Sequence, residues 1–345
     1  FTLILPVSFH SMEGGDEASL FEMDRSLREE LRVLRKGKTF LFSNLHLQSL
    51  KRSLERRGFK ALSSSMDLNG FSNIRNVGLF LAHALSMEVV LFIDNDEVVE
   101  DPRYLRIACE YLNERWEGVL ISGKGGFYLD PNGEILLSSP NLWWRILWNK
   151  TRWMNKVWKR ILASKDRFVH SPMLLGGNLA LHRHLFSQIP FDPFIPRGED
   201  TDYLINASQM GFSILFDKEL KIKHLHPPRT EVYFYEELRG DIERFLYERD
   251  KVRKGLRISL DPYPGSFLRG TLYPKAFLTA LLLAIDYCTK GKWKKGIACL
   301  DLIRLLFQKR EQTWMRYLTF CAHWGKAMEN LQEMRGDSFL EQGWV

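Results

Sequence analysis

The chain has few cysteines, and their spacing excludes a zinc site and a small disulfide-linked domain. Its four cysteines, Cys109, Cys288, Cys299 and Cys321, are scattered over 345 residues. Such spacing matches neither a zinc site nor the disulfide framework of a small secreted domain. We therefore expect reduced, buried thiols in a cytoplasmic protein.

The chain also lacks a long apolar run. None reaches the roughly 20 residues that a helix needs to cross a bilayer, and the best run, 276–287, is interrupted by Asp286. The chain begins at Phe1 without an initiator methionine, so the lack of a signal peptide carries little weight. We expect a cytoplasmic location, with peripheral contact at the inner face of the membrane left open.

The composition is that of a globular protein with anionic partners. Apolar residues make up 45% of the chain, enough for a sizeable core, and the net charge is +7. This charge favours nucleotide diphosphates, phosphorylated acceptors, an anionic membrane surface or nucleic acid, although it also serves solubility. The length suits one large α/β domain with an appendage.

Strand and helix patterns alternate over the first 93 residues. Alternation of this kind predicts a Rossmann-like α/β fold, with a mostly parallel central sheet flanked by helices. The predicted strands are 2–8, 39–44, 59–62 and 89–93, and the predicted helices are 16–36, 47–57 and 73–86.

The pattern becomes less regular and then helical. After a helix at 102–115 we expect a strand at 118–122, a loop at 123–126, a hairpin at 128–137, a helix at 200–210 and two strands within 212–226. Further helices are predicted at 236–254, 273–287, 293–308 and 312–335. We place a catalytic domain at 1–235 and a helical C-terminal region at 236–345.

The most informative segment is an apolar run that ends in two carboxylates. Residues 89–93 are all apolar and precede Asp94 and Asp96. Such a run indicates a buried strand, and ligands of open α/β sheets lie at the carboxyl ends of the strands. If the chain turns at Asn95, both carboxylates face a common cation. Oxygen ligands suit Mg²⁺ or Mn²⁺, and these ions suit a diphosphate.

Several motifs together carry a family resemblance. Asp94-Asn95-Asp96 resembles the DxD signature of nucleotide-sugar glycosyltransferases of the GT-A fold, especially their family 2. A DxD alone is common in loops, whereas ordered motifs are more specific. The resemblance covers about residues 2–230, and its other elements are Arg75-Asn76-Val77-Gly78 ("RNxG"), Gly176-Gly177-Asn178 ("GGN"), Glu199-Asp200 ("ED"), and His224 with His226 on a final strand.

The resemblance implies roles for these residues. Asp94 and Asp96 would hold Mg²⁺ or Mn²⁺, and His224 or His226 would complete the metal shell. Arg75 would contact the donor diphosphate. Without the resemblance, the aspartates would serve to cap a turn, the histidines to bond the backbone and Arg75 to cover a helix surface.

The ED pair implies the catalytic base. In inverting members its aspartate takes a proton from the acceptor hydroxyl, and Asp200 is the match. Glu199 and Asp202 are alternatives or acceptor ligands. Acidic residues at a helix N-terminus are also common as simple caps.

The nucleotide pocket is assigned by position. Pro6, Val7 and Ser8 lie at the end of the first predicted strand, and Asn44 or Ser43 lies at the end of the second, where many members carry an aspartate. This departure leaves the nucleotide base undefined. Gly177 would allow close approach of the backbone to a sugar.

These residues predict a metal-dependent glycosyltransferase. It would move a sugar from a nucleoside-diphosphate sugar to a hydroxyl acceptor, which could be a saccharide, a lipid-linked group or a phosphorylated small molecule, and we expect no nucleic-acid partner. One alternative is an inactive GT-A-like module that binds a membrane or polyanion. Another is a sugar nucleotidyltransferase, which the lack of Arg and Lys in 8–15 disfavours.

The roles of two basic segments that contain tryptophan stay open. Residues 141–168 contain five tryptophans among arginines and lysines. They could form a membrane-surface segment, an acceptor site, or a lid or oligomer contact with ordinary core aromatics. Residues 290–295 form a basic turn around Trp293, either a solvated loop or a membrane edge.

Overall fold

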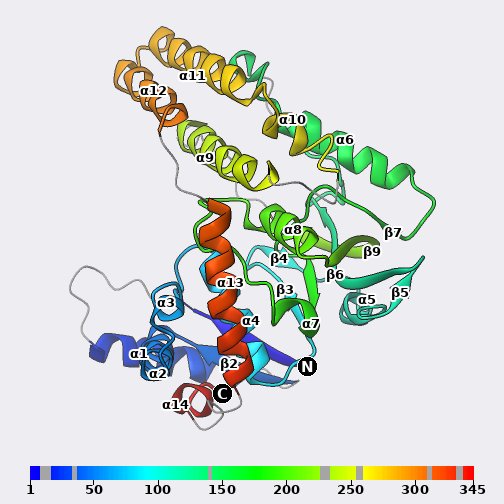
Figure 1. Ribbon diagram of the computed structural model, residues 1–345, viewed down its shortest axis with the longest axis vertical. Coiled ribbons are helices and arrows are strands. Elements are labelled where there is room, and N and C mark those ends of the chain that lie inside the picture. The colour runs from blue at the N-terminus through cyan, green and yellow to red at the C-terminus, as the bar shows by residue number, and fades with distance from the viewer. Residues whose placement is uncertain are drawn as a thin grey trace. The chain divides into compact units, whose positions relative to one another are not determined.

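The computed structural model describes residues 1–7, 17–32, 37–138, 142–225, 234–253, 259–308, 313–331 and 337–345 (Figure 1). Two of the predicted site residues, Ser8 and His226, lie outside this part of the chain. The described residues form two compact units. The first comprises Phe1–Val90, Phe186–Pro193 and Tyr317–Val345, and the second comprises Leu91–Leu185 and Phe194–Arg316.

The first unit is built on a small parallel sheet. Strands β1 and β2 pair in parallel, from Thr2 opposite Lys38 to Pro6 opposite Phe42. Phe40, Leu41 and Phe42 are all buried, so the apolar run of β2 is covered on both faces. The elements are β1 (Thr2–Pro6), α1 (Glu17–Leu31), β2 (Lys38–Phe42), α2 (Asn44–Arg56), α3 (Lys60–Ser63), α4 (Phe71–Ala84), most of α13 (Thr313–Glu329) and α14 (Ser338–Glu341).

Segment 186–193 is tied to two helices of the first unit. The Asn76 side chain on α4 accepts from Phe191 N–H at 2.8 Å and donates to its carbonyl at 2.9 Å. From α13, the Tyr317 hydroxyl donates to Pro190 O and the Trp324 indole donates to Phe186 O. Helices α4 and α13 confirm the helices predicted at 73–86 and 312–335, although the bounds differ.

The strand predicted at 59–62 is wrong, because Lys60–Ser63 forms the short helix α3. Leu62, Ser63 and Met66 are buried, which is a helical spacing that starts just after Gly58 in a left-handed conformation. A four-residue segment with three apolar residues does not distinguish a strand from one helical turn, so the sequence pattern was ambiguous.

The second unit contains a mixed sheet of order β3-β8-β6-β9-β4, with β5 added to β6 and β7 to β9. β6 and β9 are parallel and form its longest described pairing, whereas β8 is antiparallel to β6 and β4 is antiparallel to β9. The α/β class is therefore confirmed, while GT-A itself stays a prediction. The strands are β3 (Val89–Phe92), which starts at the unit boundary, β4 (Glu97–Val98), β5 (Arg115–Trp116), β6 (Val119–Leu129), β7 (Phe168–Val169), β8 (Leu179–His182) and β9 (Ser213–His224).

The loop predicted at 123–126 is also wrong, since β6 runs through it. Its glycines serve close packing between strands. A methyl group on Gly126 would overlap Leu220 O and the Asn178 amide, and one on Gly123 would crowd Leu181. Glycine inside a strand often marks such an approach, so glycine content alone misled the prediction.

The two strands predicted within 212–226 are one strand, β9. The charged residue at the expected break, Asp217, is fully buried and accepts bonds from Lys124 Nζ at 3.1 Å and Arg167 Nε at 2.9 Å. Because both cations come from distant parts of the chain, their compensation of the buried carboxylate could not be seen locally.

The helices of the second unit are α5 (Tyr104–Cys109), η1 (Trp143–Arg145), α6 (Lys150–Ala163), α7 (Arg183–Phe186), α8 (Glu199–Gln209), α9 (Phe234–Val252), α10 (Gly265–Leu268), α11 (Leu272–Thr289) and α12 (Trp293–Leu306). The predicted helices at 200–210, 236–254, 273–287 and 293–308 are confirmed, whereas α5 is much shorter than 102–115. Turn 130–133 is present, but described residues 134–138 form no second hairpin strand.

Three of the five clustered tryptophans belong to the core. Trp144, Trp148 and Trp158 are buried, and Trp148 packs edge-on against Phe267 at 5.1 Å. The interpretation as core aromatics holds for these three. All four cysteines are free, as predicted, although Cys109 is exposed and Cys288 is only partly buried. The division into a catalytic domain at 1–235 and a helical region at 236–345 stays a prediction.

Candidate active site

Asp94 and Asp96 lie on a closed turn after β3. The Asp94 N–H donates to Glu97 Oε2 at 2.8 Å, and the Glu97 N–H donates to Asp94 O at 3.2 Å. Asp94 and Asp96 are both partly exposed at this turn, and Asn95 between them is exposed. The turn at Asn95 that the sequence predicts is therefore present, with both carboxylates in reach of solvent.

His224 lies beside this acidic turn. Its Nε2 atom is 3.2 Å from Asp96 Oδ2, and β4 pairs with β9 so that Glu97 is opposite His224. The Leu225 N–H also donates to Asp96 O at 2.7 Å. Strand pairing thus brings together an aspartate of the DxD motif and a histidine of the final strand, which are far apart in the sequence.

Gly177 and Tyr128 join the same cluster. The Gly177 N–H donates to the Tyr128 hydroxyl at 2.7 Å, and the Tyr128 ring stacks on the His224 ring at 4.7 Å and 16°. A methyl group on Gly177 would overlap the carboxylate of Glu97. The group that lies against Gly177 is therefore the side chain of Glu97, which belongs to the acidic turn.

Glu97 is the residue that sequence reasoning missed. Burial raises its pKa to about 7, and the charges of Asp94 and Asp96 act in the same direction. Glu97 Oε1 is buried and has no hydrogen-bond partner among the described residues. The available signal was a third acidic residue directly after Asp96, which would have marked the turn as richer in carboxylate than a DxD alone.

Asn178 has a structural part in the same region. Its side-chain oxygen accepts from the Tyr104 hydroxyl at 2.8 Å, and its amide nitrogen donates to the carbonyls of Phe127 and Leu220. These bonds join the start of β8 to β6 and β9, so Asn178 fixes the backbone on which Gly177 meets Glu97.

In the described residues, no group of three or more His, Cys, Asp or Glu side chains is placed to hold a metal ion. Asp96 and His224 instead contact each other.

Asp200 lies in the first turn of α8. Its Oδ1 atom accepts from Thr201 N–H at 2.6 Å, and its side chain is partly exposed. Gly198 precedes the helix with φ of 74°, and a methyl group there would overlap the Arg244 guanidinium. Glycine is required at 198 by both the backbone angle and the arginine.

Arg244 is a buried cation next to the ED pair. Its Nε donates to Glu248 Oε1 at 2.7 Å, while its Nη2 is buried and has no hydrogen-bond partner in the described ranges. Asp200 raises the pKa of Arg244, as Glu248 does more strongly. Burial in turn raises the pKa of Glu248 to about 7.

We expect Glu248→Gln to remove a pH dependence of stability. The folded chain holds the Glu248 proton more tightly than the unfolded chain, whose glutamate has its ordinary pKa of 4.5. This stabilisation is complete below about pH 4.5 and is lost as pH rises through about 7. Urea unfolding at acid and neutral pH should show the wild type losing roughly 2–3 kcal/mol more than Glu248→Gln.

Glu243→Gln on the same helix is the matched control, because Glu243 pairs with Arg239 at the surface. Equal pH profiles of the wild type and Glu248→Gln would contradict the assignment.

Asp202 is engaged in a buried ion pair. Lys251 Nζ lies 2.7 Å from Asp202 Oδ1, both side chains are fully buried, and the Asn206 amide donates to Asp202 Oδ2. Glu199 is buried as well. These surroundings favour a structural role for Asp202, and of the three acidic residues Asp200 is the most accessible.

Replacing Lys251 by methionine should destabilise the protein strongly. The variant would leave the Asp202 carboxylate buried without its cation, at a cost of about 3–5 kcal/mol in the free energy of unfolding. Denaturant titration measures the change, and Lys159→Met, at an exposed lysine of the same unit, is the control. A loss similar to the control would show that the pair is dispensable.

The remaining predicted residues belong to the first unit. Pro6 ends β1, Asn44 opens α2, and Arg75 is buried on α4 with its guanidinium 5.9 Å from the Phe191 ring. Their proposed contacts with a nucleotide stay predictions.

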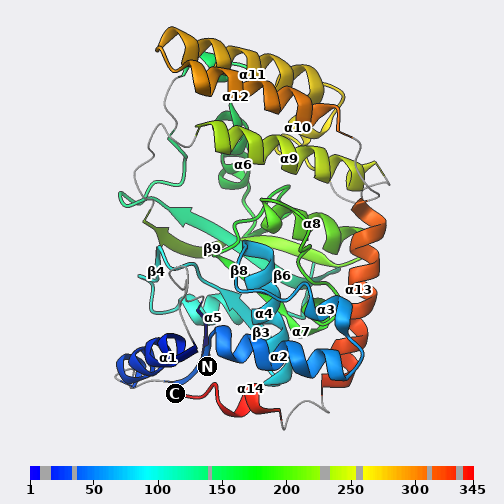
Figure 2. The ribbon, with the colours of Figure 1, turned by 90° about the vertical axis from the view of Figure 1, so that its left-hand side faces the viewer.

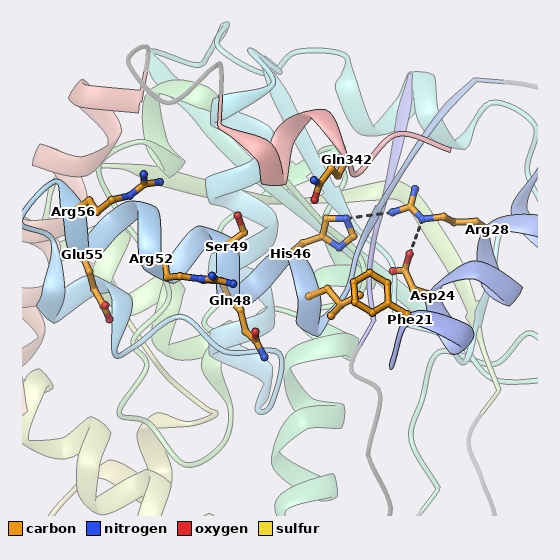
Figure 3. A pocket seen from close by; sticks show the side chains of 11 residues that line it. Phe21, Asp24, Arg28, His46, Gln48, Ser49, Arg52, Glu55, Arg56 and Gln342 are labelled. Carbon is orange, nitrogen blue, oxygen red and sulfur yellow. Dashed lines mark hydrogen bonds and ion pairs between the residues drawn. The ribbon is translucent and has the colours of Figure 1, made fainter. Parts of the chain in front are cut away.

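The first unit also carries a polar groove of about 860 Å³ (Figure 3). In it Arg28 donates to Asp24 at 2.6 Å and lies 3.2 Å from His46 Nε2, whose pKa is lowered mainly by burial. No predicted site residue lines this groove. Its lining is Phe21, Asp24, Arg28, Leu45, His46, Gln48, Ser49, Arg52, Glu55, Arg56 and Gln342.

The chain shows only weak similarity to known proteins. No family model and no curated protein matches the chain. Among solved structures, a mannosyltransferase from Pyrobaculum calidifontis in complex with GDP-Man and Mn²⁺ matches 97% of this chain and 86% of its own, with 13% identity and a TM-score of 0.40. A mycobacterial protein matches 70% of this chain and 72% of its own, with 16% identity and a TM-score of 0.34. Such TM-scores do not establish a shared fold.

Proposed function

We propose that the chain is a metal-dependent glycosyltransferase of the GT-A, family 2 type. It moves a sugar from a nucleoside-diphosphate sugar to a hydroxyl acceptor. The observation that carries this proposal is the contact of Asp96 with His224, since the DxD and the final histidine of the resemblance meet in one cluster. Chance motifs in unrelated loops would have no reason to converge.

The donor atoms of the cluster fit a divalent cation. Asp94 and Asp96 offer carboxylate oxygens, His224 offers an imidazole nitrogen, and buried Glu97 Oε1 has no partner among the described residues. Such a set matches Mg²⁺ or Mn²⁺. Asp94, Asp96 and His224 would hold the ion, which when bound would neutralise charge on the departing diphosphate.

The chain's own residues supply the rest of the chemistry. Asp200, partly exposed at the start of α8, accepts the proton of the acceptor hydroxyl as that oxygen attacks the sugar. Arg244 and Gly198 set the position of this helix start, and Arg244 adds a positive charge near Asp200. Glu97 positions the acidic turn through the Asp94 N–H.

The test is turnover by the purified full chain. A panel of nucleoside-diphosphate sugars, each with Mn²⁺, Mg²⁺ or a chelator, should include a donor that releases nucleoside diphosphate only when metal is present. Calorimetry should show that a nucleoside diphosphate binds with Mn²⁺ and not without it. Absence of both binding and turnover across the panel would refute the proposal.

A further inference from the structure

Helix α11 carries an apolar face where a surface helix is normally polar. Tyr273, Phe277, Leu278, Leu281 and Ile285 are all exposed, although their spacing places them on one side of the helix. The opposite side buries residues such as Leu283 in the core. The core therefore has no need of the exposed set, because α11 already has a separate buried face.

Helix α12 repeats this arrangement. Trp293, Ile297 and Leu300 recur at helical spacing along one side of α12, and Phe307, the residue that caps its C-terminus, continues this row and is 77% exposed. Gly296 and Cys299 lie on the buried side, and Gly296 allows α12 to approach Ala284 and Cys288 of α11 closely. Figures 1 and 2 show the two helices side by side next to α9. We call the nine exposed apolar residues of both helices the hairpin face.

The hairpin face is bordered by positive charge. Lys290, Lys292, Lys294 and Lys295 cluster where the helices join, and residues 272–306 hold six basic and two acidic residues. Asp286 offsets Lys290, one of these four lysines, and the segment 272–306 keeps a net charge of +4. Asp286 is buried and bonded to Lys290 and to the Trp143 indole, and Asp301 pairs with Arg304.

We propose that the hairpin face docks on an anionic lipid surface. Exposed aromatic and aliphatic side chains enter the boundary between headgroups and acyl chains, while the lysines contact anionic headgroups. The mode is interfacial, since no helix in the described ranges is long and apolar enough to cross a membrane. This inference does not depend on the proposed activity.

Charge distinguishes a lipid surface from a second copy of the chain. A symmetric dimer through the hairpin face would bring two net positive surfaces together, and like charges oppose such a contact. An anionic bilayer complements both features of the face at once.

The test is cosedimentation of the full chain with vesicles of phosphatidylcholine, with and without phosphatidylglycerol. We expect binding that requires phosphatidylglycerol and weakens with added salt. The triple variant Lys292→Gln, Lys294→Gln, Lys295→Gln should weaken binding by roughly fivefold per lysine. The double variant Trp293→Ser, Ile297→Ser should weaken it by at least about tenfold.

Leu105→Ser, at an exposed leucine of α5, is the matched control and should bind like the wild type. Circular dichroism checks that each variant folds, and the lysine variant changes only charge at the N-terminal end of α12. Failure to bind either vesicle, or binding that neither variant weakens, would overturn the proposal. So would sedimentation velocity showing a dimer that Trp293→Ser, Ile297→Ser dissociates, without vesicle binding.

Discussion

Asp94→Asn and Asp96→Asn should each lower the rate of sugar transfer on the order of a thousandfold. Asparagine keeps the size of each side chain but removes the charge that would hold a divalent cation. The closed turn should survive, because its two hydrogen bonds join the backbone of Asp94 to the side chain and to the backbone N–H of Glu97, so neither uses a side chain that is replaced. The measurements are kcat/KM with the active donor, and Mn²⁺-dependent binding of the nucleoside diphosphate.

Asp101→Asn is the control for these variants. Asp101 is the nearest aspartate beyond the turn and pairs with Arg103 at the surface. It should keep full activity and metal dependence. If Asp94→Asn and Asp96→Asn kept them too, the metal assignment would fail, and melting temperatures would show whether lost activity reflects lost folding.

Asp200→Asn should lower kcat by about a hundred- to ten-thousandfold while leaving donor binding nearly unchanged. The asparagine can still accept the Thr201 N–H bond, so the start of α8 should persist. It cannot take the acceptor proton. Steady-state kinetics with acceptor, together with calorimetry of the nucleoside diphosphate, separate these two effects.

Asp166→Asn, at an exposed aspartate of the same unit, is the matched control. A fall in donor affinity equal to the fall in kcat would place Asp200 at the donor rather than at the acceptor. Unchanged kcat would remove it from the proton transfer altogether.

The elements were predictable where one local pattern dominated. The apolar run before Asp94 and the spacing in α9, α11 and α12 predicted a strand and three helices that the structure contains. The Asp96–His224 contact was expected only through the resemblance, since neither residue carries a local sign of the other.

The errors came from compensation at a distance. Asp217 reads as a break in a strand until Lys124 and Arg167 are known to neutralise it. Gly123 and Gly126 read as a loop until the neighbouring strand backbone is present. The ion pair of Asp202 with Lys251 was hidden from the sequence in the same way, while the role of Asp202 as an alternative base or acceptor ligand stays a prediction. In each case the partner is remote in sequence, so spacing carries no trace of it.

The packing of Gly177 against Glu97 links two positions that are eighty residues apart in the chain. Any side chain at 177 would have to displace the glutamate, and with it the hydrogen bond that closes the acidic turn. The residues allowed at position 177 therefore depend on the residue at position 97. A larger residue at 177 becomes tolerable only together with a smaller one at 97.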